Sequence, residues 1–572
     1  MKTIIILYLA LQFLGIGTSF LYAQDVYTNL KQSYLSGEID QKIYSSKVKS
    51  LYSELLSGRY SPVSGESTIK CLFPIQAEAS RYFSSLEKSA ATFAVIRPES
   101  QASYITDEGN FKIHYDTTGT HAVDTTDLLG NTVPDWIYYT GRAYERGWSM
   151  FIDSLGYQIP PVDTVDGDQV DIYVRELSQA FAYGTTYSVN DTGFAQNAPN
   201  ITFIEMDDDF SENIYFTHGL DAMRVTAIHE LFHVFQLGYT LRPNDIWFYE
   251  LTATWMEDVG YDAVNDYLQF IEFYYADTDV GLNQFGSGFI KAIFGKFIED
   301  NYDAHVIRGT FEKMLTDKAE IALDLTLKEN ASYEPAGGLK AAWGQFALWN
   351  WFTGSRKVPG VFFEEGELYP ELIAQSDTTF SGSVLILPLF GLEELSFRIN
   401  RFIPVDDAQI KVAFTAAGNS SVWINTLTTD PPDITSLDPG SPVHLNEVNN
   451  MDGLIIAVAN GAIEGNEGSV RETYSLEVII TGVPPPELIA LYPNPVSVQT
   501  DIKFELKADK DNIKFTVYNL LGRTVHRQTI GFLAKGENTI VYFPADNLSS
   551  GIYLFRISGD QVEINGKFTL LR

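Results

Sequence analysis

The spacing of apolar residues changes along the chain and predicts different elements in each part. In residues 24–105, apolar side chains recur with approximately helical spacing. These side chains are Leu30, Tyr34, Ile43, Val48, Leu51, Leu55 and Leu56. Pro62, Gly65 and Pro74 interrupt the pattern. We therefore expect an N-terminal helical region, which can be either a pro-segment or a brace for the part that follows.

Residues 106–375 combine predicted strands with predicted helices. Short strands are predicted over residues 111–115, 170–174 and 201–204. The stretch 136–155 has helical spacing, and helical patterns dominate from Asp221 to about Gly354. Strands followed by helices in one segment indicate an α+β domain, with a mostly helical second half.

The rest of the chain has the pattern of all-β sandwich domains. Short apolar runs between turns predict a β-sandwich over residues 376–482. Its predicted strands cover residues 384–389, 395–399, 410–414, 422–424, 454–458 and 474–480. Consecutive prolines at 484–486 predict a stiff linker, and residues 483–572 therefore comprise this linker and a last module of strands and turns.

The first 23 residues have the layout of a secretory signal peptide. Lys2 precedes an apolar run over residues 4–16, and small residues lead up to Ala23. Because the run approaches the length that spans a bilayer, an N-terminal anchor is the alternative. We expect cleavage after about Ala23 and no integral membrane span afterwards, since no later run is sufficiently apolar.

Composition narrows the classes of function. A chain of 572 residues is too long for a single core. With 39 basic against 74 acidic residues, its net charge of −35 repels phosphates, so nucleic acid is not an expected partner. The single cysteine, Cys71, excludes an intramolecular disulfide and a cysteine-cluster metal site.

The stretch 225–238 carries the strongest chemical signal. Its apolar spacing predicts a largely buried helix that Gly238 ends. His229 and His233 are four residues apart, so they share a helix face and can both reach one Zn²⁺. Glu230 can then take a proton from a water whose pKa the metal lowers. This His-Glu-x-x-His pattern is typical of metalloproteases, and two core histidines bonded to backbone are the alternative.

A third ligand is expected on the next predicted helix, for which Asp245 is the expected N-cap. Glu250 is the preferred ligand, because it lies one turn into a helix that a short connection folds back against the first. Glu257 or Asp258 would fix an imidazole tautomer. His305 is a weaker candidate ligand, since no motif surrounds it.

These residues resemble a zinc metallopeptidase of the gluzincin type, whose third ligand is a Glu on the helix after His-Glu-x-x-His. Residues 105–355 are similar, more narrowly, to a family of secreted bacterial metalloproteases. The similar segments are 111–119, 130–135, 167–174, 207–210, the zinc helix and 250–258. The resemblance implies that His229, His233 and Glu250 bind one catalytic zinc and that Glu230 is the base. Gluzincins carry an acidic residue one turn after the third ligand, but Thr254 stands there, which keeps Glu257 open as a ligand.

The last module resembles the type IX secretion sorting domain. The resemblance rests on residues 491–495, 515–523, 551–557 and 566–572. It implies export across the outer membrane of a Gram-negative bacterium, contact with the type IX secretion machinery, and removal of the module. The protein is then expected to be secreted or attached to the cell surface.

Two acidic clusters are candidate Ca²⁺ sites, because calcium takes several oxygen ligands from flexible loops. One comprises Asp163, Asp166, Asp168 and Asp171, and the other Asp124, Asp127, Asn131 and Asp135. Ordinary acidic turns are the alternative.

The function of Cys71 and the identity of an oxyanion donor stay open. Cys71 can be a small buried apolar residue, or its thiolate can occupy the open zinc position and hold an enzyme inactive. The candidate oxyanion donors are Tyr239, Tyr249, Tyr261 and His305.

The leading hypothesis is a secreted zinc endopeptidase that hydrolyses protein or peptide substrates with Glu230 as general base. A surface adhesin or binding protein with a structural metal site is the alternative. A fourth protein ligand at the metal would favour that alternative. A zinc hydrolase acting on a non-peptide substrate is the third hypothesis.

Overall fold

The computed structural model describes residues 27–572 with internal gaps. The gaps are residues 28–29, 32, 35, 57–68, 83–96, 163, 181, 190–193, 212–214, 284–287, 330–336, 381–383, 405–408, 417–421, 429–432, 438–442, 446–453, 464–471, 483–486, 507–508 and 560–561. The predicted signal peptide and the prolines of the predicted linker lie outside the described residues.

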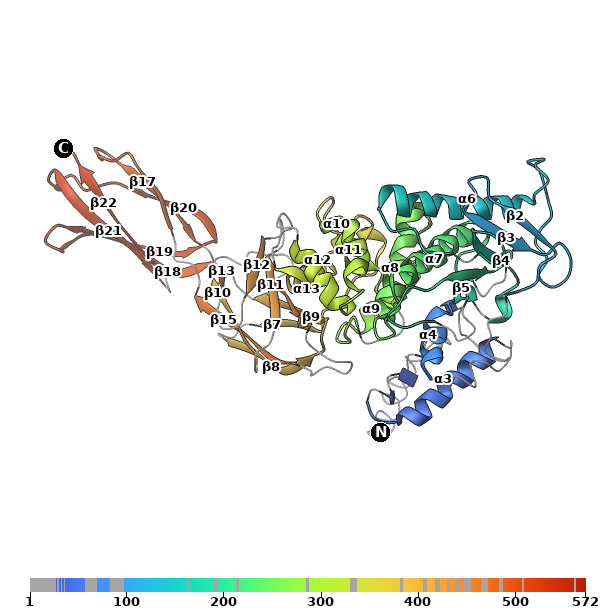
Figure 1. Ribbon diagram of the computed structural model, residues 1–572. Helices are drawn as coiled ribbons and strands as arrows, with labels where there is room; N and C mark the ends of the chain where they lie inside the picture. The colour runs from blue at the N-terminus through green and yellow to red at the C-terminus, as the bar shows by residue number, and fades with distance from the viewer. Residues whose placement is uncertain are drawn as a thin grey trace, which may run out of the picture.

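A six-stranded mixed sheet forms the part of the structure nearest the N-terminal helices (Figure 1). In sheet order its strands are β1 (Ile69–Cys71), β5 (Ala182–Ser188), β6 (Thr202–Met206), β4 (Val170–Val174), β3 (Phe111–Tyr115) and β2 (Ala102–Ile105). The pairs β3–β4 and β4–β6 are parallel, as is β1–β5, whereas β2 and β5 run antiparallel to β3 and β6. Every side chain of β4 and β6 is buried, as in strands covered on both faces. The sequence predicted β3 and β4 over the same residues, but it did not predict β1 or β2 within the N-terminal helical region.

Helices α6 (Asp135–Ser149) and α7 (Gly219–Tyr239) pack on this sheet. α6 continues as a π-helical turn over Met150–Ser154, which extends it close to its predicted end. The prediction that Gly238 ends α7 is wrong, because the helix includes this residue. A Cβ at Gly238 would lie 3.1 Å from Cβ of Pro160, so the glycine allows residues 160–161 to approach the helix.

The next helix, α8 (Ile246–Gly260), packs against α7. Asp245 precedes it, as predicted, but the Asp245 side chain makes no capping hydrogen bond. Its carboxylate accepts a hydrogen bond from the backbone N–H of Ala319 at 3.1 Å instead. Asp245 therefore ties the start of α8 to a later helix rather than capping α8.

Within the described part of the chain, five more α-helices lie between α8 and the strands that begin at residue 376 (Figure 1). They are α9 (Leu268–Ala276), α10 (Ile293–Asn301), α11 (His305–Lys313), α12 (Ala319–Glu329) and α13 (Gly338–Trp349). At the N-terminal side, α3 (Gln41–Leu56) and α4 (Phe73–Tyr82) pack together. Among the described residues, none of the helices combines the length and apolar character needed to cross a bilayer.

Two sheets follow, in the region predicted as a β-sandwich. One has the order β13 (Val443–Leu445), β10 (Gln409–Ala416), β15 (Glu472–Gly482), β8 (Val384–Leu392). The other has the order β12 (Asp433–Leu437), β11 (Val422–Thr428), β14 (Leu454–Asn460), β9 (Ser396–Pro404), β7 (Ser376–Phe380). The hydrophobic core of the helical half continues into the second sheet. Trp343 of α13 donates a hydrogen bond from Nε1 to the Ser396 carbonyl at 3.1 Å, and Phe346 contacts Phe397.

The C-terminal module consists of two smaller sheets around a separate hydrophobic core. One sheet contains β16 (Glu487–Tyr492), β17 (Thr500–Leu506) and β20 (Gly536–Tyr542). The other contains β19 (Thr524–Leu533), β18 (Lys510–Asn519), β21 (Gly551–Gly559) and β22 (Val562–Leu570). All buried members of this core come from residues 496–570, so the module has the packing of an independent domain.

Candidate metal centre

The three predicted ligands come together between α7 and α8. The Nε2 atoms of His229 and His233 lie 3.1 Å apart. Glu250 Oε2 is 3.4 Å from His229 Nε2, and Glu250 Oε1 is 3.3 Å from His233 Nε2. All three side chains are buried. Two imidazole nitrogens and one carboxylate therefore face a common point, the ligand set that catalytic zinc uses.

The other nitrogen of each imidazole has a hydrogen-bond partner. His229 Nδ1 lies 2.7 Å from Glu257 Oε1, and His233 Nδ1 lies 2.7 Å from Gln236 Oε1. Because both partners are acceptors, each Nδ1 donates a hydrogen bond to its partner, and each Nε2 faces the centre.

Glu257 is thus placed as a positioning group and not as a ligand, since it lies on the far side of the His229 ring. Its second oxygen is 2.8 Å from Lys70 Nζ, and Lys70 also pairs with Asp266. The alternative positioning residue Asp258 does not reach the histidines. Its carboxylate lies 2.5 Å from Lys296 Nζ instead.

Both carboxylate oxygens of Glu250 are buried and accept no hydrogen bond. Burying a carboxylate without a hydrogen-bond partner costs free energy, and a bound cation would offset that cost. The pKa of His229 also indicates that this site favours a positive charge. Burial lowers the pKa of His229, but Glu250 and Glu257 outweigh burial and raise it to about 10. The residues present therefore fit a divalent cation, and the mixed nitrogen and oxygen donors fit Zn²⁺ best.

Glu230 is fully buried beside this cluster. Thr186 of β5 donates a hydrogen bond to Glu230 Oε2 at 2.7 Å, while Glu230 Oε1 accepts none. Burial raises the pKa of the Glu230 carboxyl, and the neighbouring His229 and His233 lower it only in part. One oxygen of Glu230 is thus held by Thr186 of β5, and the Cys71 thiol interacts with the same carboxylate.

Cys71 joins the same cluster from β1. Its Sγ and one ligand atom each from His229, His233 and Glu250 all lie within 4.8 Å of one another. Burial, with the charges of Glu230 and Glu250, raises the pKa of the Cys71 thiol. Its full burial agrees with a small apolar residue, and its place beside the three predicted ligands also agrees with a ligand, so both interpretations of Cys71 stay predictions. Its position also meets the condition that favours a structural metal site, namely a fourth protein ligand.

Each candidate oxyanion donor contacts other groups, but of the three tyrosines only Tyr249 uses its hydroxyl hydrogen in the contact described. The hydroxyl of Tyr249 donates to the Thr240 carbonyl at 2.8 Å, and the hydroxyl of Tyr239 accepts from the Gln158 N–H at 3.1 Å. Tyr261 lies under the guanidinium groups of two arginines, Arg146 and Arg224. His305 is exposed and pairs with Asp303, so it is not a ligand of this centre.

The two acidic clusters proposed for calcium contain many internal contacts. In the first, Lys112 pairs with Asp166 at 2.7 Å and His114 with Asp171 at 2.9 Å, while Asp163 lies outside the described residues. In the second, the backbone N–H groups of residues 130–132 donate to Asp127. In the first cluster the carboxylates pair with side chains of β3, and in the second Asp127 stabilises a local turn. Calcium binding at both clusters stays a prediction.

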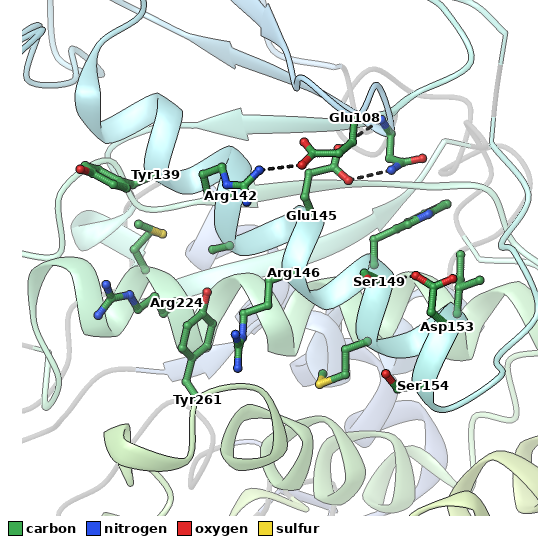
Figure 2. A pocket seen from close by; sticks show the side chains of 16 residues that line it. Glu108, Tyr139, Arg142, Glu145, Arg146, Ser149, Asp153, Ser154, Arg224 and Tyr261 are labelled. Carbon is green, nitrogen blue, oxygen red and sulfur yellow. Dashed lines mark hydrogen bonds and ion pairs between the residues drawn. The ribbon is translucent and has the colours of Figure 1, made fainter. Parts of the chain in front are cut away.

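A separate concavity of about 1010 Å³ lies between α6 and the start of α7 (Figure 2). Its lining includes Arg142, Arg146, Arg224, Glu108 and Tyr261. An ion pair between Arg142 and Glu108 crosses its rim at 2.6 Å. Cys71 and the three predicted ligands do not line this concavity, so it does not open onto the candidate metal centre.

Sequence reasoning missed several residues that support the centre. Gln236 is three residues after His233 on α7, so its spacing could have identified it as a partner of that imidazole. Thr186 and Lys70 carry no such signal, because they come from strands far away in the sequence, and Asp266 lies in the loop after α8, where no periodic pattern indicates it.

Comparisons with known proteins identify the C-terminal module. A family model described as a secretion system C-terminal sorting domain matches residues 490–570. The predicted type IX sorting domain is therefore confirmed. The protein is exported across the outer membrane to become a secreted or cell-surface protein, and this domain connects it to the type IX machinery.

The other comparisons give little information. A search of curated proteins yields no match. The adhesin domain of Epf from Streptococcus pyogenes is 10% identical, covers 32% of this chain and 72% of that chain, and has a TM-score of 0.20. A beta-glucuronidase from Faecalibacterium prausnitzii is 11% identical, covers 31% of this chain and 36% of that chain, and has a TM-score of 0.14. TM-scores this low give no guide to the activity of this protein.

Proposed function

We propose that this protein is a secreted zinc-dependent endopeptidase. The observation that carries the proposal is the convergence of His229 Nε2, His233 Nε2 and the Glu250 carboxylate, whose two buried oxygens otherwise lack a partner. Three protein ligands from two adjacent helices are the set that a hydrolytic zinc site requires.

Zn²⁺ bound by these ligands would lower the pKa of water and polarise a carbonyl group. The chain's own residues supply the rest of the chemistry. Glu257 and Gln236 hold the two imidazoles in the tautomer that directs Nε2 to the centre. Glu230, held at Oε2 by Thr186, accepts a proton from the attacking water and returns it to the leaving amine.

A peptide substrate is supported by the sheet beside Glu230. β5 runs directly past this residue, because a Cβ on Gly184 would lie 2.9 Å from Glu230 Cγ. β5 has β1 as its outer neighbour at one edge of the sheet. β1 occupies this edge in the structure, so an extended peptide could pair with β5 only in place of β1, and its backbone carbonyls would then lie next to Glu230. We therefore assign peptide bonds as the substrate class.

The first prediction tests this proposal by metal analysis and proteolysis. Purified protein should contain about one zinc per chain. Glu230→Gln should keep the zinc but lower casein hydrolysis by about 10²–10⁴-fold, because the proton acceptor is lost. Both measurements should be made on the wild-type background and on a Cys71→Ala background, in which the fourth protein ligand is absent.

Glu312→Gln, an exposed change on α11, is the matched control and should leave both quantities unchanged. Undiminished hydrolysis by Glu230→Gln would remove Glu230 from the mechanism. Absence of hydrolysis at full zinc content in both backgrounds, and also after residues 69–82 have been removed from the sheet, would refute the endopeptidase.

One observation favours a second candidate function. Cys71 supplies a fourth protein group to the cluster, and a closed set of four ligands is typical of structural zinc. The protein would then be a surface adhesin or binding protein in which the metal joins β1 to α7 and α8. In that case Cys71→Ala should destabilise the fold without producing any hydrolysis.

A further inference from the structure

The thiol of Cys71 approaches the cluster from a strand outside the two ligand helices. β1 is an edge strand of the six-stranded sheet, and its Cys71 pairs with Gly184 of β5. Because Gly184 has no side chain, β1, β5 and Glu230 can lie close together. Cys71 Sγ therefore comes within 4.8 Å of the ligand atoms on α7 and α8.

The residues next to Cys71 also contact the centre. The ring of Phe73 lies 4.7 Å from the ring of His233, measured between centroids. Lys70 Nζ lies 2.8 Å from Glu257, which in turn holds His229. Phe73 thus contacts the ligand His233, and Lys70 contacts Glu257, the hydrogen-bond partner of His229. Cys71, between them, lies against the cluster itself.

The same short strand occupies the sheet edge that the proposed function assigns to substrate. β1 pairs in parallel with β5 through Ile69 and Cys71. While β1 is in place, β5 cannot pair with a second extended chain on that side, since each strand edge pairs once. The segment therefore covers the metal position and the peptide position at the same time.

The N-terminal region has a small core of its own, apart from the main core. Its buried members are Tyr27, Tyr44, Val48, Leu51, Tyr52, Leu55, Leu72, Ile75 and Ala79, together with Ala182 of β5. Glu78 of α4 is buried and ties the region together, since Lys31 lies 3.3 Å away and Tyr44 donates to it at 2.9 Å. The region can therefore leave as a unit, with Cys71 and Phe73 as its main insertion into the larger core.

We propose that Cys71 is a removable fourth ligand, and that residues 69–82 keep the proposed zinc endopeptidase latent until they are withdrawn. This inference rests on the proposed function. Binding through Sγ requires the thiol to release its proton to solvent. On withdrawal, the sulfur–metal bond breaks and water takes the vacated position, without any change in oxidation state.

The second prediction uses Co²⁺ in place of zinc, because a thiolate on cobalt gives a near-ultraviolet charge-transfer absorption band. The full chain loaded with one Co²⁺ should show this band. Cys71→Ser and Cys71→Ala should each bind Co²⁺ but lack the band. The chain has one cysteine, so any thiolate band belongs to Cys71.

The same prediction extends to withdrawal of the segment. Residues 85–91 are replaced by the recognition sequence of a site-specific protease, and the uncleaved protein is the matched control. Cleavage and removal of the N-terminal fragment should abolish the cobalt band and retain the metal. In the zinc form, peptide hydrolysis should rise by at least about tenfold. Cys71→Ala should give a smaller rise, because β1 still covers β5.

The outcomes separate failure of the inference from failure of the proposed function. No metal uptake by the full chain would refute the metal centre itself. Metal uptake without the thiolate band would refute Cys71 as a ligand and leave the endopeptidase standing. A band that disappears on cleavage with no hydrolysis in any form would overturn latency and assign the metal a structural function.

Discussion

At the scale of single residues, the centre depends on side chains that never contact the metal position. The pattern at residues 229–233 predicts the two histidine ligands and the proposed base, because helix periodicity alone puts both imidazoles on one face. The sequence favoured Glu250 but left Glu257 open as a ligand, since both lie on the same face of α8. The fold separates them: Glu250 meets the Nε2 side, and Glu257 meets Nδ1 of His229.

The third prediction concerns the contact between Glu257 and Nδ1 of His229. Glu257→Gln keeps an acceptor for His229 Nδ1 but removes the charge that pairs with Lys70. We expect zinc affinity to fall by about 10–100-fold. Competition with a coloured chelator measures the affinity, and Glu272→Gln, an exposed change on α9, is the control. An affinity equal to that of wild type would show that Glu257 does not position the imidazole.

At the scale of elements, the close approach of β5 to α7 sets the geometry of the site. Predictions from periodicity located the helix of the ligands and the strands β3 and β4, because their apolar residues repeat regularly. The strand β1 could not be predicted in the same way. It is three residues long and pairs with β5, more than 100 residues later in the chain. Contacts at such separation depend on the assembled sheet.

The fourth prediction concerns the contact between β5 and α7. A Cβ added at Gly184 would lie 2.9 Å from both Glu230 Cγ and Thr226 Cγ2, so the Glu230 side chain has to shift. We expect Gly184→Ala to lower the free energy of unfolding by about 1–3 kcal/mol. Hydrolysis in the Cys71→Ala background should fall with it.

Gly366→Ala is the matched control, because a Cβ there meets its nearest atom at an ordinary 3.4 Å. Its effect on stability should stay below about 1 kcal/mol in either direction. Urea unfolding followed by tryptophan fluorescence measures both variants. Equal effects of the two substitutions would show that a Cβ fits between β5 and α7 without steric conflict.

At the scale of the whole molecule, an acidic chain also buries several carboxyl groups. Burial raises the pKa of Glu205, Asp245 and Asp258 to about 7 each. A carboxyl group whose pKa is higher in the folded than in the unfolded state stabilises the fold at low pH. That contribution disappears as pH rises from the unfolded value near 4 to the folded value near 7.

The fifth prediction isolates one of these groups with Asp245→Asn, which removes the titration and keeps an acceptor for the Ala319 N–H. The stability of wild type relative to this variant should fall between about pH 4 and pH 7, by at most about 1.4 kcal/mol per pH unit. Above pH 8 the difference should be constant. Thermal or urea unfolding across this range tests it, and a difference independent of pH would contradict the raised pKa of Asp245.

The core shared by α13 and the second sheet of the sandwich constrains how the chain can be shortened. Trp343 and Phe346 are fully buried, and Phe397 of β9 packs against both rings. A protein truncated at residue 375 would present these large aromatic faces to water and would tend to precipitate. The sheet that contains β9 and β14 therefore buries part of the core of the helical half. A soluble minimal fragment has to extend at least through β14.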